Sequence, residues 1–165
     1  DLRAAGSGNP GAANAIKVLG PAWGYGVMAA DILKAAGAAA AGRRVAGATG
    51  AHVAGTAAVV GHCWPAWNGF RGGKGVAASV GQCLATFPAY FPIDLAVAGL
   101  TSASPRWKQR AYAATGVASA CWVAGGVVWW RCRWPNLWGP PPTPALPLAA
   151  AASSAVILDR FRRAA

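Results

Sequence analysis

Residues 61–77 read GHCWPAWNGFRGGKGVA and place three glycines around Lys74, with Arg71 beside them. Glycine lets a backbone turn tightly, and such a turn can present N–H groups and cations to one concave point that suits a phosphate. Residues 6–14 read GSGNPGAAN and have a similar character. Two apolar segments lie between these loops and would return the chain to the same side of a membrane. We therefore expect the two loops to form one anion site.

The composition is that of a membrane protein. Of the 165 residues, 55% are hydrophobic and 12% are charged, whereas soluble domains carry about 25% charged residues. Lys and Arg total 15 against 4 acidic residues, a net charge of +11. Such a balance often indicates nucleic acid or an anionic surface. Because the basic residues here lie between long apolar runs, we expect membrane lipid and phosphorylated substrates as partners, and no nucleic acid.

The apolar segments predict an all-α, polytopic membrane helix bundle. A span of about 20 residues can cross a bilayer, and residues 23–42 and 45–60 are separated by arginines at 43–44. Residues 76–87 and 91–103 are short for a crossing, so we expect a tilted or incompletely crossing hairpin there. Further apolar segments cover residues 111–130 and 146–158. Small residues dominate these segments and favour close helix packing.

The basic residues divide unequally between the two ends of such a bundle. If every apolar segment crosses once, ten lie on the side of the glycine loops and four on the other, with Lys34 inside a span. The larger set is Arg3, Lys17, Arg71, Lys74, Arg106, Lys108, Arg110, Arg160, Arg162 and Arg163, and the smaller set is Arg43, Arg44, Arg131 and Arg133. The positive-inside rule then places both loops in the cytoplasm.

Several competing site types fit poorly. Residues 6–11 match the G-x-G-x-x-G pattern, but an Ala-rich apolar span follows them, and the dinucleotide fingerprint needs a βαβ unit. A Walker A loop would need Gly at Asn68 and Ser or Thr at Gly75. The four cysteines form no C-x-x-C pair, so we expect neither a zinc site nor a disulfide framework. We expect no metal and no cofactor.

The motifs of residues 1–80 resemble those of the bacterial membrane acyl-phosphate:glycerol-3-phosphate acyltransferases. The stretches that carry the resemblance are Asp1-Leu2-Arg3, Gly6-Ser7-Gly8-Asn9, Gly11-Ala12-Ala13-Asn14, Asp31-Ile32-Leu33-Lys34, Gly61-His62 with Pro65, and Phe70-Arg71-Gly72-Gly73-Lys74-Gly75-Val76-Ala77. The second half is similar only in hydropathy. That family has a membrane helix before the first motif, and because this chain begins at Asp1 without Met, we expect one domain over residues 1–165 that lacks its natural N-terminus.

The resemblance implies transfer of a fatty acyl group from acyl phosphate to the sn-1 hydroxyl of glycerol 3-phosphate, which gives lysophosphatidic acid and phosphate. Ser7 and Lys74 are the expected catalytic residues, and Ser7 would orient a substrate by hydrogen bonding. The expected phosphate-binding residues are Arg3, Gly8, Asn9, Asn14, Lys17, Arg71, Gly72, Gly73 and Gly75. Asn9 and Asn14 either bind glycerol hydroxyls or brace their loop. His62 and Ser119 are further candidate site residues. His62 is either a base or a residue that braces its loop. Asp31 and Lys34 share a helix face and either form a structural pair or take part in function.

The sequence departs from the family pattern at several positions. Ala13 replaces the usual Thr, Lys17 replaces Arg, and Gly116 stands where the third motif has a functional Ser. The C-terminal segment, residues 157–161, lacks the family's His and Asn. These departures keep a second hypothesis open, a non-catalytic relative that binds phospholipid or a phosphorylated metabolite. A small transporter is less favoured, because no internal repeat is evident.

Overall fold

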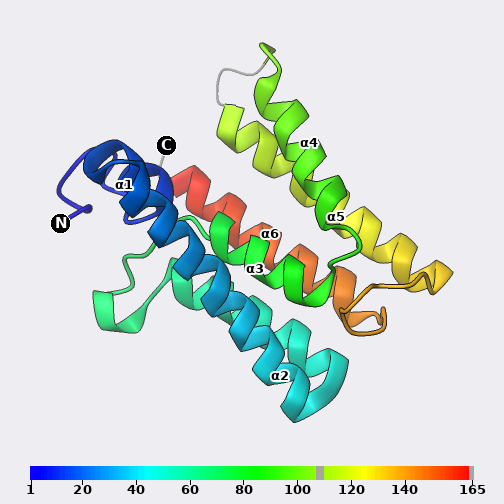
Figure 1. The fold of residues 1–165 in the computed structure, drawn as a ribbon. Helices are drawn as coiled ribbons and strands as arrows, with labels where there is room; N and C mark the ends of the chain where they lie inside the picture. The colour runs from blue at the N-terminus through cyan, green and yellow to red at the C-terminus, as the bar shows by residue number, and fades with distance from the viewer. Residues whose placement is uncertain (107–109, 164–165) are drawn as a thin grey trace.

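All regular secondary structure in the described part of the chain is helical, as the sequence predicts (Figure 1). The computed structural model describes residues 1–106 and 110–163. Lys108, one of the cations counted above, lies outside them. The elements are α1 (Ala12–Leu19), α2 (Pro21–Cys63), the 3₁₀ turn η1 (Ala66–Asn68), α3 (Val76–Thr86), α4 (Phe91–Ala103), α5 (Arg110–Cys132) and α6 (Ala145–Arg163).

Helix α2 folds back on itself as two antiparallel arms (Figure 1). The turn lies at Ala46 and Gly47, where Gly47 has φ 60° and ψ −145°, a backbone conformation that favours glycine. The arms meet closely beside the turn, because a Cβ on Gly50 would lie 2.1 Å from the carbonyl oxygen of Gly42. The predicted break at residues 43–44 is therefore displaced by about one helical turn, to the residue that tolerates a positive φ.

Helix α3 packs against α2 through small residues. A Cβ on Gly81 would lie 2.1 Å from the carbonyl oxygen of Ile32, and a Cβ on Gly55 would lie 2.8 Å from Cγ of Gln82. Such contacts between helices are possible only without side chains at those positions. The close packing expected from the Ala and Gly content is therefore confirmed, since small residues let helix backbones approach in a membrane protein.

A buried polar network ties three helices together. Gln82 of α3 donates to the hydroxyl of Thr56 on α2 at 3.1 Å. Ser153 of α6 donates to Oε1 of Gln82 at 2.7 Å. Gln82 and Ser153 are fully buried, so these hydrogen bonds fix the relative rotation of α2, α3 and α6.

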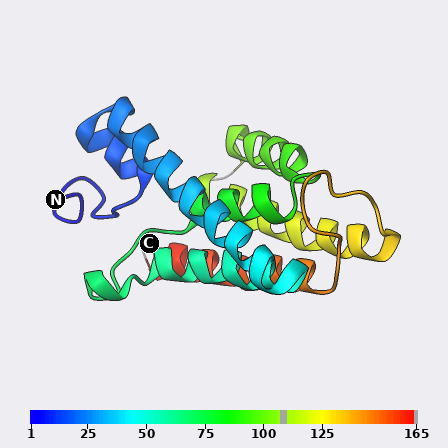
Figure 2. The same cartoon turned by 60° about the horizontal axis from the view of Figure 1, so that its bottom comes forward.

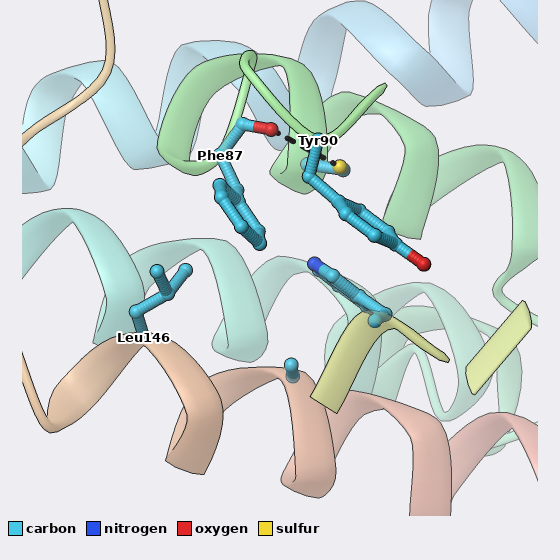
Figure 3. Close-up of a cluster of buried hydrophobic side chains, with 6 residues drawn as sticks. Phe87, Tyr90 and Leu146 are labelled. Carbon is cyan, nitrogen blue, oxygen red and sulfur yellow. Dashed lines mark hydrogen bonds between the residues drawn. The ribbon is translucent and has the colours of Figure 1, made fainter. Parts of the chain in front are cut away.

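The largest cluster of buried apolar side chains lies where α3 turns into α4, against α5 and α6. Phe87 and Tyr90 stack with their ring centroids 5.1 Å apart, and Leu146 approaches them from α6 (Figure 3). Trp122 of α5 belongs to the same cluster, and the thiol of Cys83 donates to the Phe87 carbonyl. This cluster fixes α5 and α6 against the α3–α4 corner.

Within the described residues, one helix is long and apolar enough to cross a membrane by itself. It covers Ala111–Cys132, with a mean hydropathy of 1.4. Helices α3 and α4 are apolar but have 11 and 13 residues, fewer than the roughly 20 needed for a full crossing. Both helices are as short as the sequence indicates, but α3 packs mainly against α2 and α4 mainly against α5, so the two have little contact with each other.

Figures 1 and 2 agree on how the helix ends are distributed. The N-terminal loop, residues 64–75 and the C-terminal end of α6 gather at one end of the bundle, which we call the loop end. The turn of α2 and residues 133–144 lie at the opposite end, the far end, where Arg43 donates to the Trp138 carbonyl at 2.7 Å. The two glycine loops thus lie on one side of the molecule, as the sequence predicts.

Candidate phosphate pocket

A pocket of about 510 Å³ opens at the loop end, between the two glycine loops and α6. Its lining is Asp1, Arg3, Ala4, Ser7, Gly8, Asn9, Pro10, Phe70, Arg71, Gly72, Lys74 and Arg160. Seven residues proposed from the sequence belong to this lining, namely Arg3, Ser7, Gly8, Asn9, Arg71, Gly72 and Lys74. The fold therefore brings together residues about 70 positions apart in the chain.

The N-terminal loop is shaped around the buried side chain of Asn14. Its Oδ1 accepts from the Ser7 N–H at 2.9 Å, and its Nδ2 donates to the carbonyls of Leu2 and Ala5 at 3.0 Å. Gly6 has φ 60°, and a Cβ there would lie 2.2 Å from Oδ1 of Asn14. The sequence left two roles open for Asn14, and in the structure its side chain braces the loop. The same contacts hold Ser7 at the pocket.

Asn9 has a local partner as well. Its Oδ1 accepts from the Gly11 N–H at 3.0 Å, an arrangement that fixes the turn through Pro10 before α1 begins. Asn9 also lines the pocket, so its amide nitrogen can face a ligand while its oxygen braces the loop.

The second loop is pressed against the end of α2. The N–H groups of Gly72 and Gly73 donate to the carbonyls of Cys63 and His62, each at 3.2 Å. A Cβ on Gly72 would lie 2.0 Å from the His62 carbonyl oxygen. We expected the N–H groups of this loop to face the anion, but the N–H groups of Gly72 and Gly73 bind α2 instead. The glycines therefore allow the loop backbone to approach α2 closely, and the cationic side chains of the loop line the pocket.

Lys74 is held between the pocket and the last turn of α6. Its Nζ lies 4.3 Å from the ring centroid of Phe161, a cation–π contact that orients the ammonium group. Partial burial lowers the pKa of Lys74 below its ordinary value of 10.5, because desolvation disfavours the charged form. An anion bound beside the ammonium group would replace part of that lost solvation.

His62 belongs to a neighbouring ionic cluster. Lys34 pairs with Asp31 at 2.6 Å, as the sequence predicts, and His62 Nδ1 lies 3.2 Å from the same carboxylate oxygen. Lys34 Nζ is 2.7 Å from that ring nitrogen. These side chains line a second pocket of about 400 Å³, which shares Arg71 with the first. His62 thus faces the second pocket, and its participation in the Asp31–Lys34 pair was not predicted.

The other predicted residues lie outside the first pocket's lining. Lys17 is exposed on α1, and Gly73 lines the second pocket. Gly75 precedes α3 with φ 89°, where a Cβ would lie 2.9 Å from Sγ of Cys63. Ser119 is buried in α5 and lines neither pocket. Near Ser119, a Cβ on Gly116 would meet open space.

Five lining residues were not proposed as site residues from the sequence, namely Asp1, Ala4, Pro10, Phe70 and Arg160. Of these, Arg160 could have been predicted from helical spacing. It shares a helical face with Ser153 and Ile157, at spacings of seven and three residues. Both of those residues are buried, so a helical projection of the last segment would have turned Arg160 toward the bundle.

Comparisons with known proteins agree with this geometry. The family model described as "Glycerol-3-phosphate acyltransferase" matches residues 1–163. A protein of that name from Thermoanaerobacter sp. (strain X514) is 46% identical over 97 residues, which cover 59% of this chain and 49% of the relative. One from Gloeobacter violaceus is 42% identical over 105 residues, which cover 61% of this chain and 50% of the relative. The chain spans about half the length of the curated relatives it matches.

The fold also matches solved structures. A crystal structure of PlsY (YgiH), an integral membrane glycerol 3-phosphate acyltransferase in its glycerol 3-phosphate form, superposes with a TM-score of 0.77 at 28% identity. The match covers 99% of this chain and 76% of that one. The lysophosphatidic acid form gives a TM-score of 0.74 at 27% identity and covers 95% of this chain and 74% of the other.

Proposed function

The chain belongs to the glycerol-3-phosphate acyltransferase family, and from this premise we propose that it transfers a fatty acyl group from acyl phosphate to the sn-1 hydroxyl of glycerol 3-phosphate. The hydroxyl oxygen attacks the acyl carbonyl carbon, the bond from that carbon to the phosphate oxygen breaks, and the hydroxyl proton ends on the departing phosphate. The products are lysophosphatidic acid and inorganic phosphate. The related structures in glycerol 3-phosphate and lysophosphatidic acid forms support this choice of acceptor and product.

The observation that carries the proposal is the convergence of cations on one pocket. Arg3, Arg71, Lys74 and Arg160 line it from three separate parts of the chain. Both proposed substrates bear phosphate, and holding them side by side lowers the entropic cost of the reaction. As the acyl phosphate bond breaks, negative charge grows on the leaving phosphate, and preorganised cations stabilise that charge.

Within this proposal, Ser7 and Lys74 act on the substrates from opposite loops. Ser7 lines the pocket and its backbone is fixed by Asn14, so we assign its hydroxyl the role of orienting a substrate by hydrogen bonding. The ammonium group of Lys74 neutralises phosphate. A direct transfer requires no acyl-enzyme, in agreement with the lack of a Ser-His-Asp arrangement in the sequence.

We further propose that the protein spans the bacterial inner membrane with its loop end in the cytoplasm. The unequal division of Lys and Arg between the two ends supports this orientation through the positive-inside rule. The exposed apolar side chains on the helices, such as Leu33, Val53 and Leu100, give the bundle a surface compatible with lipid.

The test is an acyl-transfer assay with the protein reconstituted in bilayers. Acyl phosphate, acyl-CoA and acyl carrier protein are supplied in parallel as donors with labelled glycerol 3-phosphate. We expect lysophosphatidic acid from acyl phosphate alone. Binding of glycerol 3-phosphate without turnover of any donor would instead select the non-catalytic relative, and transfer from acyl-CoA alone would overturn the proposed donor.

A further inference from the structure

Arg160 in the last turn of α6 is hydrogen-bonded to the second glycine loop. Arg160 Nε donates to the Gly73 carbonyl at 3.2 Å, and Nη2 donates to the Gly72 carbonyl at 2.8 Å. The guanidinium carbon lies 5.7 Å from the ring centroid of Trp64. Two carbonyls and an aromatic face thereby fix the plane of this guanidinium group.

The same guanidinium group retains hydrogen-bonding capacity toward the pocket. A guanidinium carries five N–H donors and stays charged at all relevant pH values. Within residues 1–106 and 110–163, its hydrogen bonds engage two of those donors. Because Arg160 lines the first pocket, the others can reach a bound phosphate while the loop contacts stay in place.

The neighbouring residue acts on Lys74. The Phe161 ring lies 4.3 Å from Lys74 Nζ and 5.9 Å from the Tyr112 ring. The aromatic pair therefore restricts where the ammonium group can go. Two adjacent residues of α6 thus hold this loop: Arg160 contacts its backbone before Lys74, and Phe161 contacts the Lys74 side chain.

The charge balance favours an anion at this place. Four cations line the pocket with one acidic side chain, Asp1, which is paired with Arg3 at 2.5 Å. The remaining positive charges repel one another across the pocket, and a bound phosphate relieves that repulsion.

We propose that the end of α6 completes the acyl-transfer site, with Arg160 as a phosphate-binding residue that also holds the 72–74 loop, and Phe161 as a residue that positions Lys74. This inference rests on the proposed function and assigns a role to the segment where the chain departs from the family's C-terminal pattern.

The experiment compares Arg160→Ala, Arg160→Lys and Phe161→Leu with the wild-type chain in bilayers. Arg163→Ala is the matched control, because Arg163 is exposed and pairs with Asp159 on the same helix. Equilibrium binding of glycerol 3-phosphate and acyl-phosphate turnover are both measured. Thermal unfolding in detergent reports whether each variant is folded.

For Arg160→Ala we expect binding of glycerol 3-phosphate to weaken by about 10- to 100-fold, as for loss of a charged hydrogen bond. Arg160→Lys should recover most of the binding but lose at least about fivefold in kcat, because an ammonium group keeps the charge without the fork that holds the loop. Phe161→Leu should lower kcat/KM by about threefold. Arg163→Ala should stay within about twofold of wild type.

The outcomes separate the two proposals. Wild-type turnover with unchanged binding and kinetics in both Arg160 variants would overturn the inference and leave the proposed function standing. Wild-type binding without turnover, weakened by Arg160→Ala, would overturn the proposed function and support the phosphate-binding role. A folded wild-type chain that neither binds glycerol 3-phosphate nor uses acyl phosphate would overturn both. If Arg160→Ala fails to fold, Arg160→Lys tests the inference: a loss of at least about fivefold in kcat supports it, and wild-type kinetics overturn it.

Discussion

At the scale of single residues, the N-terminal segment and the second glycine loop contribute cations that the rest of the chain holds in place. Arg71 and Lys74 were predictable because their loop has the composition of an anion site. Their supports were harder to predict. Arg160 and Phe161 contact Lys74 and its loop from nearly 90 positions away in the chain. A local sequence pattern does not predict which distant residues will meet. The sequence left the role of Asn14 open, since ligand binding and loop bracing use the same amide group.

Lys74→Ala should reduce acyl transfer by at least about 100-fold, because it removes a preorganised cation from the growing phosphate charge. The fold should persist, since Lys74 lines the pocket and belongs to neither apolar cluster. The measurement is turnover in bilayers together with thermal unfolding. Arg44→Ala, which removes one exposed charge at the far end, is the control and should leave turnover unchanged. Normal turnover in folded Lys74→Ala would refute the role of Lys74.

The pKa of Lys74 predicts an alkaline limit to substrate binding. Burial lowers that pKa below 10.5, so the ammonium group loses its proton at a lower pH than an exposed lysine. Affinity for glycerol 3-phosphate should therefore fall as pH rises through the lowered value. In Lys74→Arg the guanidinium stays protonated, and the fall should move to higher pH. An identical fall in the KM profiles of both proteins would contradict this assignment.

At the scale of elements, small residues decide where helices meet. The apolar segments were recognisable from the sequence because their lengths and bounding charges are local properties. The turn of α2 was displaced from the predicted arginines because Gly47 accepts a positive φ and because Gly42 and Gly50 let the arms touch. Helix α1 was not predicted, since it has only eight residues and ends at Gly20, directly before α2 begins at Pro21.

Gly81→Ala should destabilise the bundle by about 1–3 kcal/mol, because the new methyl group meets the backbone of α2 and overpacked contacts cost that much. A Cβ at this position would lie 2.1 Å from the carbonyl oxygen of Ile32. Gly99→Ala in α4 is the matched control, since a Cβ there meets nothing within 4 Å. Thermal unfolding in one detergent should show a lower midpoint for Gly81→Ala alone. Equal midpoints for both variants would contradict the close α2–α3 contact.

At the scale of the whole molecule, the bundle sorts its chemistry to one end. The pocket with its four cations and both glycine loops lie at the loop end, while the exposed Cys132 lies where α5 reaches the far end. The overall arrangement followed from hydropathy and charge counts. The meeting of α6 with the second loop did not, because it depends on the helix rotation set by Gln82 and Ser153.

The orientation predicts which cysteines an impermeant maleimide can label in intact cells. Cys132 should react from outside, because it is exposed at the far end. A Trp67→Cys change in a Cys132→Ser background should react only after the membrane is permeabilised, since Trp67 is 89% exposed but lies at the loop end. The reverse pattern would show that the loop end faces outward.

The central claim is that two loops distant in the chain share one phosphate pocket. Hydrogen exchange of the reconstituted protein, with and without saturating glycerol 3-phosphate, tests this claim most directly. We predict that the ligand slows exchange both in residues 4–9 and in residues 70–74, while residues 133–139 at the far end exchange at an unchanged rate. Protection confined to one of the two loops, with ligand demonstrably bound, would contradict the account.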